Sequence, residues 1–283
     1  MVYPLAAGQD ISSGASVEVM LAIGAAMFFP SIGVALTRLL TGEGFRDCCI
    51  KPRPLRKSFP WFAVVWLMMP TLVAAGAAVY YLLFPSDFDP SCAGMATLLM
   101  QQAAAAGVPV QLPDGVTIAQ LAVAQIALGV VAGPVLNFLP ALGEEWGWRG
   151  YLALKLIGRM GFVKAMLVSG VIWGLWHAPI TALGHNYGVG YPGFPFAGIA
   201  AMTVACVAWG TLLSFVTLKT GSCMAAAFAH GSLNALVAAP AFFSVTGGNP
   251  FVGPASTGIV GGIAFLIAVV VVLAVMGKRR FPL

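Results

Sequence analysis

The chain has 283 residues, of which 60% are hydrophobic and 8% are charged, and its mean hydropathy is +0.93. Soluble domains carry about 25% charged residues, so this composition excludes an ordinary water-soluble fold. The net charge of +5 does not indicate a nucleic-acid partner, because the Lys and Arg residues stand in short segments between apolar runs. Cytoplasmic loops of membrane proteins carry their basic residues in this way.

Several apolar runs are long enough to cross a hydrocarbon core as helices, which takes about 20 residues. Seven of them cover residues 17–40, 60–84, 116–140, 162–184, 195–218, 222–244 and 255–277. An eighth, shorter segment, residues 141–158, is unusual because it contains four of the chain's charged side chains, Glu144, Glu145, Arg149 and Lys155. The sequence therefore predicts an all-α, polytopic transmembrane helical bundle with seven or eight membrane helices.

The distribution of charge predicts an orientation. Six basic residues follow the first apolar run: Arg38, Arg46, Lys51, Arg53, Arg56 and Lys57. The charged residues of the loop at 85–115 are all acidic, so the first connection is expected in the cytoplasm and the N-terminus outside. The basic tail at 278–280 then lies inside if segment 141–158 enters the bilayer without crossing it, and outside if that segment crosses. We expect an integral protein of the plasma membrane, in contact with lipid and with its C-terminus inside.

Three parts of the chain follow from this pattern. Residues 1–115 are expected to form N-terminal helices and an external loop, residues 116–245 a functional core, and residues 246–283 a C-terminal helix with a basic tail. A Gly- and Pro-rich stretch at 185–195, which begins with His185, is interpreted as an external turn rather than as part of a site.

The first cluster of polar residues within the apolar segments is Glu144-Glu145-x-x-x-Arg149. Ionisable residues in membrane segments are costly, and they usually face a bundle interior where they have a function. Glu145 and Arg149 are four residues apart and can pair on a helix, whereas Glu144 is rotated by about 100° from Glu145 and lacks that partner. A partly desolvated carboxylate without a cationic partner is suited to act as a general base on water.

Two further clusters follow along the chain. The first is Trp173-x-x-x-His177, in the later half of an apolar run, and the second is His230-x-x-x-Asn234, whose spacing places both side chains on one helix face. A carboxylate, two imidazoles and a carboxamide can hydrolyse an amide, since some of these groups activate water and others donate hydrogen bonds to the oxyanion. The same groups could also bind a metal that activates water.

These three motifs, in this order, resemble those of the CPBP family of intramembrane peptidases, which includes type II CAAX prenyl endopeptidases and proteins like lysostaphin resistance protein A. The resemblance covers about residues 116–245, and Trp173 departs mildly from the Phe that is more frequent at that position. It implies that Glu144 is the catalytic carboxylate and His177 its water-activating partner. By the same resemblance His230 and Asn234 form the oxyanion-side pair, and Glu145 with Arg149 is a supporting structural pair.

The resemblance leaves the choice between a glutamate-dependent protease and a metalloprotease open. If zinc takes part, its ligands would be Glu144, His177 and His230, which would compete with the role of Glu144 as base. The expected substrate is a peptide or lipidated protein at the membrane, of which a prenylated CAAX protein is one class. The sequence does not indicate an oligomeric state.

Two other functions are compatible with membrane-embedded Glu, His and Arg residues. A non-catalytic family member could act as a membrane scaffold or immunity factor, and loss of a motif residue would indicate this, but all the motif residues are present. A proton-coupled transporter would show matching halves with broken helices, and no such pairing is seen between the two halves of this sequence. An intramembrane endopeptidase is the leading hypothesis.

Overall fold

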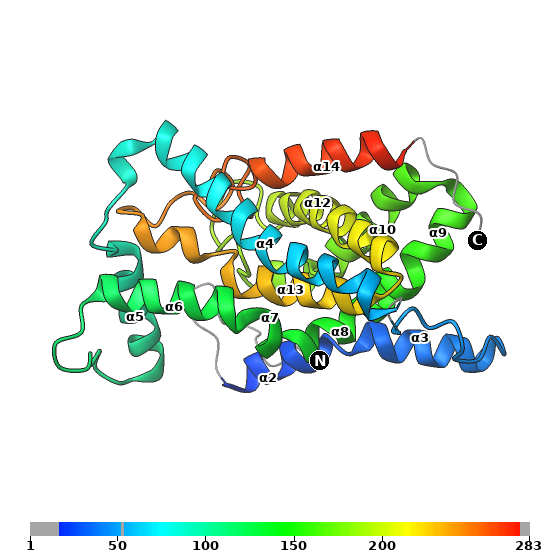
Figure 1. The fold of residues 1–283 in the computed structure, drawn as a ribbon. Coiled ribbons are helices and arrows are strands. Elements are labelled where there is room, and N and C mark those ends of the chain that lie inside the picture. Colours follow the sequence, from blue (N-terminus) through cyan, green and yellow to red (C-terminus); the bar gives the residue numbers. More distant parts are fainter. Residues whose placement is uncertain (1–16, 52–53, 278–283) are drawn as a thin grey trace.

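The computed structural model describes residues 17–51 and 54–277, and the regular elements in this part of the chain are helices (Figure 1). The predicted all-α class is therefore confirmed. Four helical stretches are long and apolar enough to cross a membrane: Glu18–Leu40, Arg56–Leu83, Phe196–Thr220 and Cys223–Phe243. Three shorter apolar helices accompany them: Ile118–Val131, Phe162–Trp176 and Ile263–Met276. The number of membrane crossings stays a prediction.

The first two membrane stretches lie on the outside of the bundle. The first consists of α2 (Val17–Ala26) and α3 (Phe29–Leu40), which meet at a short break, and Pro30 stands in the first turn of α3. Proline is tolerated there because the first N–H groups of a helix have no intrahelical partner. The second is α4 (Leu55–Leu83), which is followed by the single turn η1 (Pro85–Asp87) and by α5 (Ala93–Ala106).

The predicted helix at 116–140 is interrupted and continues into the predicted eighth segment. Helix α6 (Ile118–Val131) begins with a capping box and is followed by α7 (Gly133–Leu136), α8 (Phe138–Gly147), a π-helical turn η2 (Trp148–Leu152) and α9 (Ala153–Met160). Pro134 explains the first break, since proline has no N–H to continue the ladder. Figure 1 shows α6 at one end of the bundle and α9 at the other, so residues 118–160 make one interrupted passage along it.

Two other predicted helices are shorter than expected. Helix α10 (Phe162–Trp176) ends before residue 184, because His177 caps it and Pro179 starts the short α11 (Ala178–Thr181). Helix α14 (Ile263–Met276) starts later than residue 255, after a loop whose glycines allow the backbone to pass close to α4. The other predicted runs correspond to α12 (Phe196–Thr220) and to α13 (Cys223–Leu236) with η3 (Ala239–Phe243).

Helix α13 lies at the centre of the bundle and contacts α4, α7, α8 and α12. Its buried face consists largely of alanines, which are fully buried and permit close helix packing. One hydrophobic core joins α13 with residues of α4, α10, α12 and α14. This core includes residues from all three predicted parts of the chain, and the division at 115 and 245 stays a prediction.

The basic residues gather at one end of the bundle, which we call the basic end. There the Lys155 ammonium lies 3.0 Å from the Glu43 carboxylate, and the backbone N–H of Cys223 donates to the carbonyl of Cys49. Nine described Lys and Arg residues belong to the segments that meet there, namely α3 and the loop after it, the starts of α4 and α10, α9, and the last turn of α12: Arg38, Arg46, Lys51, Arg56, Lys57, Lys155, Arg159, Lys164 and Lys219. Arg53 and the tail residues Lys278, Arg279 and Arg280 lie outside the described residues.

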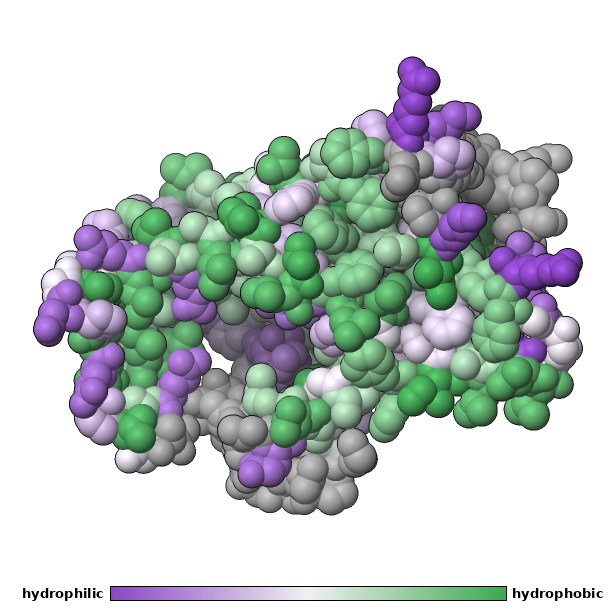
Figure 2. Space-filling model, turned by 60° about the horizontal axis from the view of Figure 1, so that its bottom comes forward, coloured by the Kyte–Doolittle hydropathy of each residue, from purple (hydrophilic) through white to green (hydrophobic). Residues whose placement is uncertain are grey.

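The opposite end contains the acidic residues of the predicted external loop. Asp87 accepts hydrogen bonds from Tyr80, Ser244 and Thr246, which ties the end of α4 to the segment after η3. Figure 2 shows hydrophobic surface over much of the face it presents, with hydrophilic side chains gathered toward the ends. This distribution is the one expected of an integral membrane protein.

Candidate active site

A cavity of about 650 Å³ lies among α2, α8, α10, α12 and α13. Its lining includes five of the predicted site residues: Glu144, Trp173, His177, His230 and Asn234. The predicted supporting residues Glu145 and Arg149 lie behind this wall and are buried. Figure 2 shows a hollow with a hydrophilic floor on the face that carries α2 and α3. Three motifs that are separated by up to 90 residues in the sequence therefore meet around one space.

Glu144 is buried in the cavity wall, with 3% of its surface exposed. Its Oε2 accepts two hydrogen bonds, one from the indole N–H of Trp148 at 3.1 Å and one from that of Trp173 at 2.7 Å. Both donors are neutral, and Arg149 pairs with the neighbouring Glu145 instead, as the helical spacing predicted. Within the described chain, Oε1 of Glu144 has no hydrogen-bond partner, so this oxygen is available to a water molecule in the cavity.

The buried Glu145 carboxylate has two polar neighbours, the Arg149 guanidinium and the His230 imidazole. Its Oε1 accepts from the Arg149 guanidinium at 2.9 Å and lies 2.9 Å from Nδ1 of His230. A carboxylate oxygen can only accept, so Nδ1 of His230 is the donor and carries the ring proton. The other ring nitrogen, Nε2, does not take part in this bond.

His177 is fixed in a defined tautomer by the helix end that it caps. Its Nδ1 lies 2.8 Å from the carbonyl oxygen of Trp173, which can only accept, so Nδ1 carries the proton. Nε2 is therefore the nitrogen with a free lone pair. The Cys206 thiol is 3.7 Å from Nδ1 on the other side. His177 can thus accept a proton through Nε2 while its ring orientation is held by the backbone.

Trp173 connects the members of the site. Its indole donates to Glu144, and its ring centroid lies 5.6 Å from that of His177 and 5.4 Å from that of His230, both in edge-to-face geometry. The Arg149 guanidinium carbon stands 3.9 Å from the centroid of the same ring. Sequence analysis singled out Trp173 for its spacing, but the position of its ring among four charged or titratable residues depends on the packing of α8, α10 and α13.

The π-helical turn begins directly after the Glu144-Glu145 pair. It contains Arg149 and Gly150, both buried, and Gly150 lies against the indole of Trp146 and the Cys223 side chain. Such wide turns inside α-helices occur frequently at functional sites. Here the turn contains the cation that neutralises Glu145.

The structure also brings residues to the cavity that sequence reasoning did not select. His185 and Asn186, from the stretch interpreted as an external turn, line the cavity beside His177, so the interpretation of this stretch as remote from any site is wrong. The chain bends inward after α11, which the sequence did not indicate. Trp148 was also missed, although its spacing of four from Glu144 could have identified it. Asn234 is exposed toward the cavity, as its shared face with His230 suggested.

The predicted zinc ligands are Glu144, His177 and His230. Nδ1 of each imidazole is hydrogen-bonded and Oε2 of Glu144 accepts from two indoles, so the atoms left to bind a metal would be the two Nε2 atoms and Oε1. Within residues 17–51 and 54–277, however, no three His, Cys, Asp or Glu side chains are grouped closely enough to hold a metal ion.

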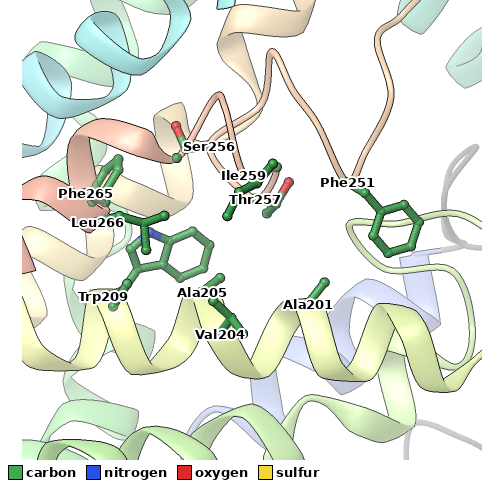
Figure 3. Close-up of a pocket in the computed structure, with 13 residues that line it drawn as sticks. Ala201, Val204, Ala205, Trp209, Phe251, Ser256, Thr257, Ile259, Phe265 and Leu266 are labelled. Carbon is green, nitrogen blue, oxygen red and sulfur yellow. The ribbon is translucent and has the colours of Figure 1, made fainter. Parts of the chain in front are cut away.

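A second, smaller cavity of about 150 Å³ lies between α12, α14 and the loop before α14 (Figure 3). Its lining is apolar apart from Ser256 and Thr257, and Trp209 lines both this cavity and the larger one. It offers no acid, base or nucleophile comparable to those of the larger cavity.

The site can now be compared with known proteins. A family model described as type II CAAX prenyl endopeptidase Rce1-like matches residues 119–236. Residues 119–236 are thus similar to this family. The matched segment begins in α6 and ends with α13, so it contains Glu144, Glu145, Arg149, Trp173, His177, His230 and Asn234.

A curated protein shows a similar likeness over a shorter stretch. A stretch of 52 residues is 40% identical to CAAX prenyl protease 2 of Methanococcus maripaludis, and it covers 18% of this chain and 19% of that protein. The similarity thus spans about a fifth of the relative's length. No solved structure matches the chain.

Proposed function

We propose that this protein is a membrane-embedded endopeptidase that hydrolyses a peptide bond of a membrane-anchored substrate. The observation that carries the proposal is the environment of Glu144. This carboxylate lies in the wall of an intramembrane cavity, and both of its hydrogen-bond donors are neutral indoles. The imidazoles of His177 and His230 lie around the indole ring of Trp173. The Rce1-like segment supports a protease at the level of the family.

In the proposed reaction, Glu144 Oε1 and His177 Nε2 bind one water molecule and remove a proton from it. The resulting hydroxide attacks the carbonyl carbon of the substrate, and the carbonyl oxygen gains the negative charge. A protonated His230, stabilised by Glu145, donates to this oxyanion through Nε2, and the amide of Asn234 is a second donor. When the tetrahedral intermediate breaks, the proton held by Glu144 or His177 passes to the leaving amine, so the products are a carboxylate and an amine.

The substrate class follows from the position of the site and from the family. The cavity lies within a bundle of apolar helices, so the substrate must enter the bilayer or be held at it by an anchor. A prenylated CAAX peptide is the first probe, since the family's description names this substrate. We propose that lipid surrounds the bundle and that the reaction needs no metal, because the described side chains do not form a ligand set.

Cleavage of a fluorogenic prenylated CAAX peptide by the purified protein in detergent tests the proposal. Glu144→Gln keeps the size of the side chain and its ability to accept from the two indoles, but it cannot take up a proton. We expect a loss of at least about 100-fold in kcat, the contribution typical of a general base. Glu43→Gln, at the basic end, is the matched control and should cleave like the wild type. Equal rates in Glu144→Gln and wild type would contradict the proposal.

A further inference from the structure

Two polar residues of the cavity wall, His185 and Asn186, have no part in the proposed reaction. The other polar side chains of the lining act on water or on the oxyanion, and they come from α8, α10 and α13. His185 and Asn186 come from the loop after α11, and the rest of the lining is aliphatic or aromatic. The cavity therefore has a second polar wall whose ligand the reaction does not name.

The backbone turns at Gly184, directly before these two residues. Gly184 has a φ of 100°, a conformation that glycine adopts at little cost. Its N–H donates to the carbonyl of Thr181 at 3.0 Å, and the N–H of His185 donates to that of Ile180 at 3.1 Å. This pair of bonds is the Schellman motif, which ends a helix at a residue with positive φ. The end of α11 thus fixes the backbone position of His185.

The segment is also held on both sides of the two polar residues. Leu183 is buried against α2, and the hydroxyl of the buried Tyr187 donates to a carbonyl of the loop before α14 at 3.1 Å. Between these anchors Asn186 has a φ of 66°, which Asn tolerates better than most residues. Side chains on a segment fixed in this way keep a defined position, as a binding site requires.

Most of the hydrogen-bonding capacity of this wall is unused. Within the described chain the ring nitrogens of His185 have no hydrogen-bond partner, and Asn186 has a weak one, since its Nδ2 lies 3.5 Å from Sδ of Met202. Burial and the neighbouring His177 lower the pKa of His185 to about 4, so this loop imidazole is neutral near neutral pH. A neutral imidazole has one donor and one acceptor, and a carboxamide has both kinds as well.

These properties fit the backbone of a peptide better than a charged group. A peptide backbone presents N–H donors and carbonyl acceptors in alternation, so it can satisfy both kinds of group. A buried charge would need an opposite charge, and the described lining contains no Lys or Arg. Beside the polar pair, Ile180 and Met202 form an apolar surface for the side chains of such a peptide.

We propose that His185 and Asn186 form a substrate-binding wall that hydrogen-bonds to the backbone of the peptide in this cavity. The two residues bind the peptide and take no part in the proton transfers. The inference rests on the proposed function, because it assigns substrate contacts within the same cavity, but binding of a peptide can be measured without cleavage.

The first test compares KM and kcat for the fluorogenic prenylated CAAX peptide. His185→Phe keeps a ring and removes its donor and acceptor, whereas His185→Gln keeps both. We expect His185→Phe to raise KM about 3- to 10-fold with kcat within about twofold, since a bond made equally in the ground and transition states affects KM alone. His185→Gln should recover most of this loss. Val189→Ala, in the same loop but exposed and outside the lining, is the control.

Asn186→Gly provides a second variant, because glycine keeps the positive φ and loses only the amide. It should raise KM in the same way. An unchanged KM in both His185→Phe and Asn186→Gly would overturn the proposal. So would a lower kcat and a lower melting temperature at constant KM, because that pattern indicates a purely structural role.

The second test identifies the backbone as the ligand and needs no catalysis. Proteins that carry Glu144→Gln keep the peptide intact, and energy transfer from Trp176 and Trp209 in the lining to a dansyl group on the prenylated CAAX peptide reports binding. Replacing one backbone amide of the peptide by an ester removes an N–H and weakens a carbonyl. At one position this change should weaken binding about 3- to 10-fold, but no more than about twofold when His185→Phe is also present.

The outcomes of the binding test separate the two proposals. Losses that add at every ester position would overturn the substrate-binding wall, and so would failure of the Glu144→Gln protein to bind the peptide. Binding with the expected dependence on His185, together with no cleavage by the wild type, would refute the proposed function and leave the binding wall standing.

Discussion

The indole N–H of Trp173 donates a 2.7 Å hydrogen bond to Oε2 of Glu144, and these two residues are 29 positions apart in the sequence. The bond joins α8 to α10 and directs one oxygen of the carboxylate into the wall, which leaves the other for the cavity. Because the same ring touches His177, His230 and Arg149, its shape matters as much as its hydrogen bond.

Two substitutions at Trp173 should separate these contributions. Trp173→Phe keeps an aromatic ring between the imidazoles and Arg149 and loses only the bond to Glu144, so we expect kcat to fall by about tenfold, the lower end of the contribution of one hydrogen bond to a charged group. Trp173→Leu removes the ring contacts as well and should lower kcat at least about 100-fold. It should also lower the free energy of unfolding by about 3 kcal/mol, as large-to-small core changes do. Equal kcat values for the two variants would contradict this division.

Arg149 is expected to be essential for stability because it neutralises Glu145 in the bundle interior. Arg149→Met leaves that carboxylate buried with His230 alone, and removal of one partner of a buried pair costs about 3–5 kcal/mol. Thermal unfolding in detergent micelles measures the change. The double variant Glu145→Gln/Arg149→Met removes both charges and should recover part of the loss. Lys155→Met, which breaks the exposed pair with Glu43, is the control and should leave the melting temperature nearly unchanged.

Gly174 determines how closely α10 approaches α12. A Cβ at this position would lie 2.5 Å from the Cα of Thr203, a backbone atom that cannot rotate away. Gly174→Ala should therefore push α10 outward, displace His177 three residues later, and cost about 1–3 kcal/mol as overpacking does. We expect both the melting temperature and kcat to fall. Gly33→Ala in α3 meets no atom within 4 Å and should leave both unchanged.

Asp87 should make the stability of the end opposite the basic end depend on pH. Burial opposes its charge, but hydrogen bonds from Ser244, Thr246 and Tyr80 outweigh this effect and hold the pKa of the carboxyl below its ordinary value. A lowered folded pKa means that the stabilisation is complete above the ordinary pKa of about 4 and is lost as the pH falls through the lower, folded value.

Asp87→Asn should remove this dependence, because an amide NH₂ cannot accept the bonds from Tyr80 and Ser244. We expect a loss of about 1–3 kcal/mol at neutral pH, typical of hydrogen bonds to a charged group. The measurement is the melting temperature at pH values from about 3 to about 7, a range that includes the ordinary carboxyl pKa of about 4. Asp114→Asn, in the exposed loop, is the control, and an equal pH response in wild type and Asp87→Asn would refute the assignment.

Removal of metal should not affect cleavage. The described residues hold no group of three His, Cys, Asp or Glu side chains suited to a metal, so wild-type rates after dialysis against a strong chelator should equal those before it. Loss of cleavage on chelation, restored by added zinc, would show that the cavity rearranges to bind a metal and would replace the proposed mechanism.

The sequence by itself determined the fold class of the protein and the pairs of site residues that lie on the same helix. Apolar runs of helical length require a membrane bundle, because only helices and closed barrels satisfy backbone hydrogen bonds in lipid. Helical periodicity placed Arg149 beside Glu145 and Asn234 beside His230, since residues four apart share a face. These inferences are local and need no knowledge of which helices meet.

The tertiary structure decided everything that joins distant segments. The pairing of Glu145 with His230, the bond from Trp173 to Glu144 and the inward path of His185 depend on how α8, α10 and α13 pack, which local periodicity cannot report. Breaks within helices also escaped prediction, because a single Pro134 or a π-turn changes direction without changing hydropathy. The position of the cavity also follows from that packing, since buried side chains such as Arg149 fill the bundle behind Glu144.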